Sequence, residues 1–254
     1  MKYNIPKVVD KKYLMAAIFK YSQLPEQSLQ SEESCKLRRI LYAYTTEEMI
    51  NVVARKYSAI YMNAVKQYMI NNGLREVKDL LAFFGDKSYG AEFFPDFISF
   101  VIKYVMDALS INSTPKIQFV KSGELFAKYA KNSKDKSMRF IEEAGAAYYD
   151  SDVNTIYFKE DKITDFDTFM NNLAHEISHS IDTLDATKGV FGDKTIQKWC
   201  DALYTTDGDE YKYNAEEKAA GRIGVVIGKD FTRKLTESWN QDRVKSFMNF
   251  QDVR

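Results

Sequence analysis

The sequence predicts an α+β fold, in which a helical region over residues 1–112 precedes a region with a small sheet over residues 113–254. Apolar residues recur at helical spacing through the first region, whereas two β-rich runs precede a long helical stretch in the second. The segment Ile111-Asn112-Ser113-Thr114-Pro115 interrupts these patterns, so it marks the predicted boundary.

Five helices are expected in the first region from capping residues and apolar spacing. The first, second, third and fifth can begin at Asp10, Ser31, Thr45 and Pro95. The third helix is expected to end at the run 71–73. The fourth is expected to end near Gly85, and the fifth at about Ser110. The third helix has the clearest apolar face, formed by Met49, Ile50, Val53, Tyr57, Ile60, Tyr61, Ala64, Val65 and Tyr68. Such a stripe is typical of a buried core.

Three strands are expected in the second region. Residues 116–120 form the first, and the runs 146–150 and 155–158 flank a turn signal at 151–154. This arrangement predicts a β-hairpin just before the next helix. If one of its strands is an edge strand, its unpaired backbone groups can bind an extended peptide.

The only two histidines of the chain lie four residues apart, in His175-Glu176-Ile177-Ser178-His179. On an α-helix positions i and i+4 lie on one face, so in this H-E-x-x-H pattern both imidazoles can bind a single Zn²⁺. Glu176 then lies beside the metal, where its carboxylate can act on a water molecule. Thr164 or Asp165 can cap the expected helix. Its apolar stripe consists of Phe166, Phe169, Met170, Leu173, Ile177 and Ile181.

Two histidines are too few ligands, because a catalytic zinc site usually has three protein ligands and an open fourth position. No third histidine exists, and Cys35 and Cys200 lack motif partners, so a carboxylate is expected. The best segment is 213–224, where Asn214 can cap a second helix and Glu217 is its third residue.

Asp185, six residues after His179, is a competing third ligand. That spacing needs a sharp turn, which glycine normally allows, but Asp182 stands at this place and the helix can simply continue. Asp185 therefore ranks behind the 213–224 segment. Asp182 itself is expected either to orient an imidazole from outside the ligand set or to be an exposed helix carboxylate.

With H-E-x-x-H at 175–179 followed by Glu217-x-x-Ala220 or Glu216-x-x-Ala219, the chain resembles the gluzincins, zinc metallopeptidases with a later E-x-x-A/S on a second helix. The resemblance is nearest to small bacterial toxin and effector proteases of the lethal-factor-like kind, in which Asp tends to follow the second His, as Asp182 does here. It implies a zincin-like catalytic domain that binds one Zn²⁺ per chain and hydrolyses peptide bonds.

By this resemblance Glu217 or Glu216 is the third ligand beside His175 and His179, and Glu217 is favoured because its cap is better placed. Related enzymes often use Tyr or His to stabilise the negative charge of the tetrahedral intermediate. No histidine is left for that task, so the candidates are Tyr213 and Tyr211, and then Arg222. The predicted hairpin looks like the edge strand that borders the cleft in zincin folds.

Composition limits the partners. The formal net charge is zero, which gives no indication of nucleic acid or of an anionic membrane. No apolar run has transmembrane length, no signal peptide is recognisable, and two cysteines make no disulfide framework. We therefore expect a cytoplasmic protein, or, as the resemblance to effectors implies, one exported by a signal-less route into a host cell. The expected substrate is a protein or peptide.

A second hypothesis is a non-catalytic interaction protein, in which the helical half binds the partner and the zinc site is structural or vestigial. A closed structural site needs a fourth protein ligand, and the sequence offers no evident one.

Overall fold

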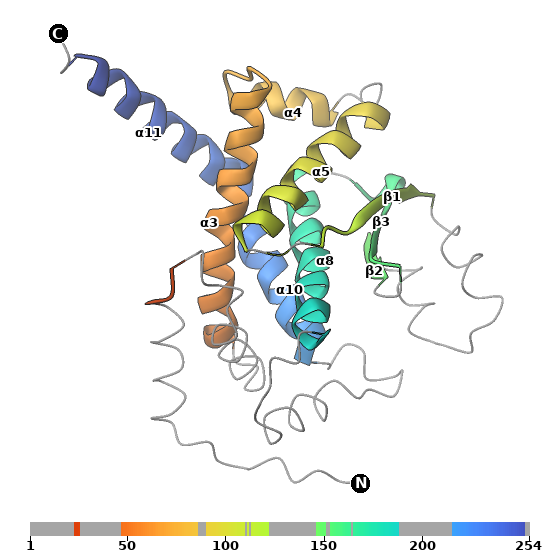
Figure 1. Cartoon of the computed structure of the whole chain (residues 1–254). Helices are drawn as coiled ribbons and strands as arrows, with labels where there is room; N and C mark the ends of the chain where they lie inside the picture. The colour runs from red at the N-terminus through yellow and green to blue at the C-terminus, as the bar shows by residue number, and fades with distance from the viewer. Residues whose placement is uncertain are drawn as a thin grey trace, which may run out of the picture.

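The computed structural model of the chain describes residues 23–25, 47–85, 90–109, 111, 113–121, 146–150, 153–163, 165–187 and 215–251. These residues form a mixed α+β fold that is mostly helical and includes one three-stranded sheet, as the sequence predicts. The sheet lies to one side of the helices (Figure 1). Among the described helices, none combines the length and apolar character needed to span a membrane. The helices predicted from Asp10 and Ser31 lie outside the described residues.

The long third helix of the prediction is α3, Glu47–Asn71. It ends at Asn71, within the predicted run 71–73, and Gly73 follows with a φ of 67°, in the left-handed region that glycine adopts without strain. The amides of Gly73 and Leu74 donate to the carbonyls of Ile70 and Met69, as in a Schellman motif. The described residues of its predicted apolar face are buried: Val53, Tyr57, Ile60, Tyr61, Ala64, Val65 and Tyr68.

Two shorter helices follow, α4, Val77–Gly85, and α5, Gly90–Ala108. α4 ends where predicted, but the predicted start of α5 is wrong, because the helix begins at Gly90 and Pro95 lies inside it. Proline already has a helical φ, so this residue removes a backbone hydrogen bond without preventing the helix. Burial of the apolar face that begins at Phe97 and Ile98 offsets this loss.

The sheet consists of β1, Lys116–Val120, β2, Ala147–Asp150, and β3, Thr155–Lys159, with β3 in the middle. β2 and β3 form the predicted antiparallel hairpin, and β1 pairs with β3 in parallel. Asn154 in the hairpin turn has a φ of 46°, which asparagine tolerates better than most residues. Its side chain accepts from the Tyr149 hydroxyl and donates to Ser113 Oγ, both at 3.0 Å, so the turn is fastened to the segment before β1.

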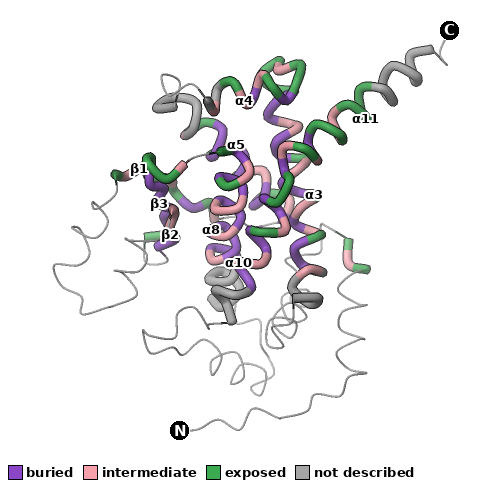
Figure 2. Tube along the Cα trace, turned by 180° about the vertical axis from the view of Figure 1, so that it is seen from behind, coloured by how far each residue is buried: buried purple, intermediate pink, exposed green. Residues whose placement is uncertain are grey.

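The H-E-x-x-H pattern lies on α8, Phe166–Thr187, whose predicted apolar stripe is buried. The ring centroids of Phe158 on β3 and Phe169 on α8 lie 5.5 Å apart, and those of Phe84 on α4 and Phe166 on α8 lie 4.9 Å apart. Buried residues from both sides of the predicted boundary therefore share one core, where α3, α5, α8 and α10 face one another (Figure 2). The division into domains 1–112 and 113–254 stays a prediction.

Two further helices complete the described fold. α10, Ala215–Gly228, packs against α8 on one side and α3 on the other. A short turn with Asp230 at a φ of 55° leads into α11, Phe231–Gln251, whose far end projects from the body (Figure 1).

Candidate metal centre

Local sequence explains why α8 begins at Phe166. Asp165 caps the helix, since its carboxylate accepts hydrogen bonds from the Thr168 amide at 2.8 Å and the Thr168 hydroxyl at 2.6 Å. This confirms one of the two predicted caps. The apolar stripe faces the core, which leaves His175 and His179 half-buried on another face of the helix.

The imidazoles of His175 and His179 converge through their Nε2 atoms, which lie 3.0 Å apart. Two Zn–N bonds of 2.0–2.1 Å at the tetrahedral angle place the nitrogens about 3.3 Å apart, so the pair fits a zinc ion with little adjustment. The same separation suits a hydrogen bond between the rings, whose proton a metal ion would displace. The two histidines could therefore supply half of a tetrahedral ligand set.

Glu176 is the acidic member of the cluster. Its potential ligand atoms and those of the two histidines all lie within 4.8 Å of one another. Glu176 as a whole residue is only 6% exposed. Because it follows His175 by one residue, it lies about 100° further around the helix. A general base must lie beside the reacting centre, and the cluster brings the Glu176 carboxylate near the histidine pair.

α10 approaches α8 more closely than most side chains allow. A Cβ atom built on Gly224 would lie 2.4 Å from Asn171 Oδ1 and 2.7 Å from the Asn171 carbonyl oxygen. A Cβ atom on Gly228 would lie 2.6 Å from Asn171 Cβ and 2.7 Å from the Asp167 carbonyl oxygen. Both glycines are therefore required by close packing against the backbone of α8.

These contacts establish which end of α10 lies beside the histidines. Gly228 lies near Asp167 at the start of α8, whereas a Cβ atom on Gly221 would lie 4.0 Å from His175 Nδ1. The two helices are therefore antiparallel, and the turn of α10 before Gly221 continues along α8 beyond His175. Glu217, four residues before Gly221, belongs to this face of α10.

Glu216 and Glu217 both lie in the first turn of α10, and Glu217 is its third residue, as predicted. The structure describes the backbone at these two positions and not the side chains. Glu216 shares its helix face with Ala219 and Ile223, which are buried in the common core. The register of the backbone therefore favours Glu217 over Glu216 for a position facing α8.

Asp185 lies within α8, which continues as a helix through Asp182 to Thr187. Residues 166–187 thus contain no sharp turn of the kind that the short-spaced third ligand needs. Six residues along a helix correspond to a rise of about 9 Å and a net rotation of about 240°. The Asp185 backbone is consequently displaced from the face that carries His175 and His179.

The candidate donors for a developing oxyanion are placed only in part. Tyr211 and Tyr213 lie outside the described residues. Arg222 is half-buried, and its Nε donates to Asn51 Oδ1 on α3 at 2.8 Å. That contact directs this part of the guanidinium to α3, on the side of α10 that packs away from the histidines.

β2 lies beside α8 as an edge strand of the sheet. The Lys159 amide donates to the Ala146 carbonyl at 2.9 Å, which marks these residues as a hydrogen-bonded pair. Such pairs alternate along an antiparallel ladder, so the backbone groups of Ala147 and Tyr149 point away from β3. Within the described part of the chain, no strand pairs with this outer edge.

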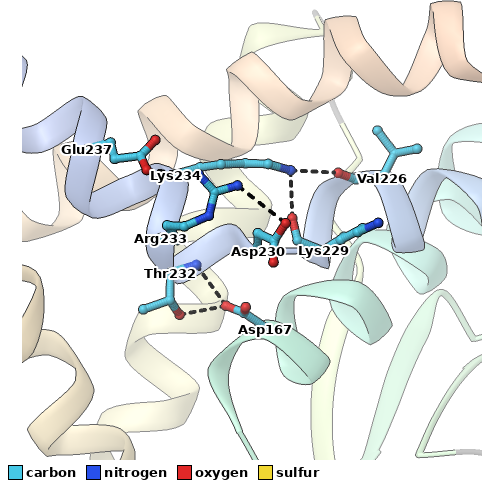
Figure 3. A network of polar contacts seen from close by, with 8 residues as sticks. All are labelled: Asp167, Val226, Lys229, Asp230, Thr232, Arg233, Lys234 and Glu237. Atoms are coloured by element: carbon cyan, nitrogen blue, oxygen red, sulfur yellow. Dashed lines mark hydrogen bonds and ion pairs between the residues drawn. The ribbon is translucent and has the colours of Figure 1, made fainter.

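Sequence reasoning missed how α10 is anchored at its far end. The Thr232 amide and hydroxyl donate to Asp167 Oδ1 at 2.7 and 2.6 Å, which joins the start of α11 to the start of α8 (Figure 3). Lys234 Nζ donates to the carbonyls of Val226 and Lys229, at 3.5 and 2.6 Å, and so caps the C-terminus of α10. No pattern of neighbouring residues predicts hydrogen bonds between segments so far apart in the chain. The helical spacing of Gly221, Gly224 and Gly228, by contrast, could have indicated a close helix contact.

The chain has no match among models of protein families, and neither curated proteins nor solved structures match it significantly. A functional assignment therefore depends on the site itself.

Proposed function

We propose that this protein is a zinc-dependent metallopeptidase with a zincin-like domain of the gluzincin type, in which α8 is the active-site helix. The observation that carries the proposal is the convergence of His175 and His179 Nε2, at 3.0 Å, beside the buried side chain of Glu176. Zn²⁺, when bound, supplies Lewis acidity that polarises a peptide carbonyl and makes water a nucleophile near neutral pH.

The residues that would hold the ion are His175 and His179, through Nε2, and Glu217 as the third ligand. Two observations support this set. His175 presents Nε2 to its partner and Nδ1 toward α10, so Nε2 is the ligating atom. The glycine contacts orient α10 so that the turn with Glu217, which precedes Gly221 in the chain, continues along α8 from His175 in the direction of His179. Glu216 is the alternative, and Asp185 ranks third.

The Glu176 carboxylate is the proposed general base. It accepts a proton from the attacking water and delivers it to the nitrogen of the departing amine, so the carboxylate is regenerated after each cleavage. Tyr213 or Tyr211 donates a hydrogen bond to the oxyanion. Arg222 ranks after them, because its Nε already donates to Asn51.

The proposed substrate is an extended segment of a protein. It adds as a further strand along the outer edge of β2, which lies at the edge of the described sheet. Backbone pairing holds a peptide without regard to its side chains, and it accepts internal segments, so endopeptidase activity is favoured. The resemblance to effector proteases favours a host protein as the target.

The proposal is tested by identifying new protein termini in a proteome incubated with the zinc-loaded chain or with Glu176→Gln. This substitution keeps the size of the side chain and removes its basicity, so zinc is retained and cleavage is lost. Termini produced by the wild type and absent with Glu176→Gln are the expected result. If neither zinc-loaded protein produced termini beyond those of the untreated proteome, the non-catalytic interaction protein would be favoured, and identical new termini with both would remove Glu176 from the mechanism.

A further inference from the structure

The proposed ligands lie on two helices, so their geometry depends on how closely α10 lies to α8. Zinc–ligand distances vary by only about 0.2 Å around their usual values, which leaves little freedom for the second helix. Beside His175, the contact between Gly224 and Asn171 limits how closely the two helices approach.

We propose that Asn171 and Gly224 are positioning residues of the zinc site, whose contact sets the separation of α8 and α10 and so brings Glu217 within reach of the ion. The inference rests on the proposed function, because it gives this contact a role only if the two helices share a metal ion.

Both residues are in register with the proposed ligands. Asn171 lies one turn before His175 on α8, and Gly224 lies two turns after Glu217 on α10, in each case on the same helix face. A Cβ atom on Gly224 would also lie 3.3 Å from His175 Cβ. The contact between Asn171 and Gly224 therefore lies directly beside His175 and on the face of α10 that carries Glu217.

The obstacle that an added side chain would meet at Gly224 is rigid. The Asn171 amide group could rotate away from a new Cβ atom, but the Asn171 carbonyl oxygen, 2.7 Å away, belongs to the backbone of α8. Alanine at this position must therefore push α10 outward. The displacement moves the first turn of α10 together with the rest of the helix.

Other contacts of α10 act elsewhere. Thr232 binds Asp167 beyond the C-terminal end of α10, and Arg222 binds Asn51 on the side of α3. These bonds hold one end and one flank of the helix. Gly228 also presses on Asn171 but lies one turn further from His175, so the contact of Gly224 with Asn171 is the close α10–α8 contact beside His175.

Gly221→Ala is a matched control for Gly224→Ala. It makes the same substitution on the same helix face, nearer to Glu217, and the new Cβ atom would lie at an ordinary 4.0 Å from His175 Nδ1. Both variants gain the same helix propensity. A difference between them in zinc affinity therefore reports the close contact with α8.

The test is a double-mutant cycle on the full chain, with zinc affinity measured by competition with a chelator. Gly224→Ala is expected to weaken zinc binding about 10–100-fold, the range typical of outer-shell residues, and Gly221→Ala to leave it unchanged. In the Glu217→Ala background, Gly224→Ala should cause no further loss, because it acts through that carboxylate. The visible spectrum of the Co²⁺-substituted Gly224→Ala protein should shift in the direction of the Glu217→Ala spectrum.

Wild-type affinity in Gly224→Ala overturns the inference, and so does a loss that persists in full without the Glu217 carboxylate. If Gly224→Ala does not fold, the cycle is run with Asn171→Leu, which keeps the branched shape of a half-buried side chain and enlarges the atom that faces Gly224. Wild-type zinc affinity in Asn171→Leu, or a loss that persists in full without the Glu217 carboxylate, then overturns the inference. A wild-type chain that binds no zinc refutes the proposed function itself, and this is seen before any variant is compared.

Discussion

Two helix pairs in this molecule are joined in opposite ways. α10 meets α8 through glycines that press on backbone atoms, whereas α11 meets α3 and its following turn through long side chains. Lys66 on α3 reaches Ser238 and Asp242 of α11, and Trp239 Nε1 donates to the Arg75 carbonyl at 2.9 Å. Long side chains can follow a shift of a helix, but a backbone contact cannot. The fold is therefore rigid beside the proposed ligands and adaptable where α11 leads away.

The largest effect is expected at the histidines. His175→Ala or His179→Ala removes one of the two converging imidazoles, so bound zinc should be lost after dialysis, as measured by elemental analysis. Ser178→Ala is the control on the same helix, because the Ser178 hydroxyl donates to the Ala174 carbonyl. Full zinc occupancy in the double histidine variant would show that the α8–α10 pair holds no metal centre.

The next effect identifies the third ligand. Glu217→Ala should weaken zinc binding by more than the roughly 10–100-fold typical of outer-shell losses, because a direct ligand is removed. Glu216→Ala and Asp185→Ala should have mild effects, since neither backbone position continues the row of glycines that faces α8. Chelator competition across the three variants ranks them. A large loss only at Glu216 moves the assignment by one residue, and one only at Asp185 replaces the gluzincin class by the short-spaced class.

A smaller effect is expected at the far end of α10. Asp167→Ala removes the acceptor of two hydrogen bonds from Thr232 and should lower the free energy of unfolding by about 1–3 kcal/mol, measured with urea. Asp167→Asn keeps an acceptor oxygen and should cost less. If the two variants were equally destabilised, the hydrogen bonds to Thr232 would not be the cause.

The smallest effect is expected at α3 and α11. Lys66→Met breaks an ion pair with Asp242, which is half exposed, so the stability should change by no more than about 1 kcal/mol. A double-mutant cycle with Asp242→Asn isolates the pair. A coupling as large as the loss in Asp167→Ala would contradict the contrast between the two helix pairs.

Features encoded by neighbouring residues were predictable from the sequence. The cap of α8, predicted at Thr164 or Asp165, the helix stop predicted at 71–73 and the hairpin around 151–154 each depend on a few adjacent residues, and the structure confirms Asp165, the stop and the hairpin. Pro95 misled the prediction because proline resembles a start signal, although apolar burial further along α5 holds the longer helix together.

The same distinction between local and long-range features holds for the candidate site. H-E-x-x-H is a local pattern, and its two histidines converge as expected. The choice among Glu216, Glu217 and Asp185 stayed open because it depends on how a separate helix packs. The depth of the contact between Gly224 and Asn171 depends on residues far apart in the chain, so no spacing rule could give it. Tyr211 and Tyr213 lie outside the described residues, and their role stays a prediction.

The hydrogen bond between Arg222 and Asn51 joins residues 171 positions apart, which bears on the order of folding. Closing so long a loop costs conformational entropy before any contact repays it, so we expect local helices and the β2–β3 hairpin to form first and α10 to dock late. If α8 and α10 share the proposed ligand set, that set would be completed only in this step, and zinc would then stabilise the docked chain by mass action. Amide hydrogen exchange should accordingly slow more in α10 than in the hairpin when zinc is added.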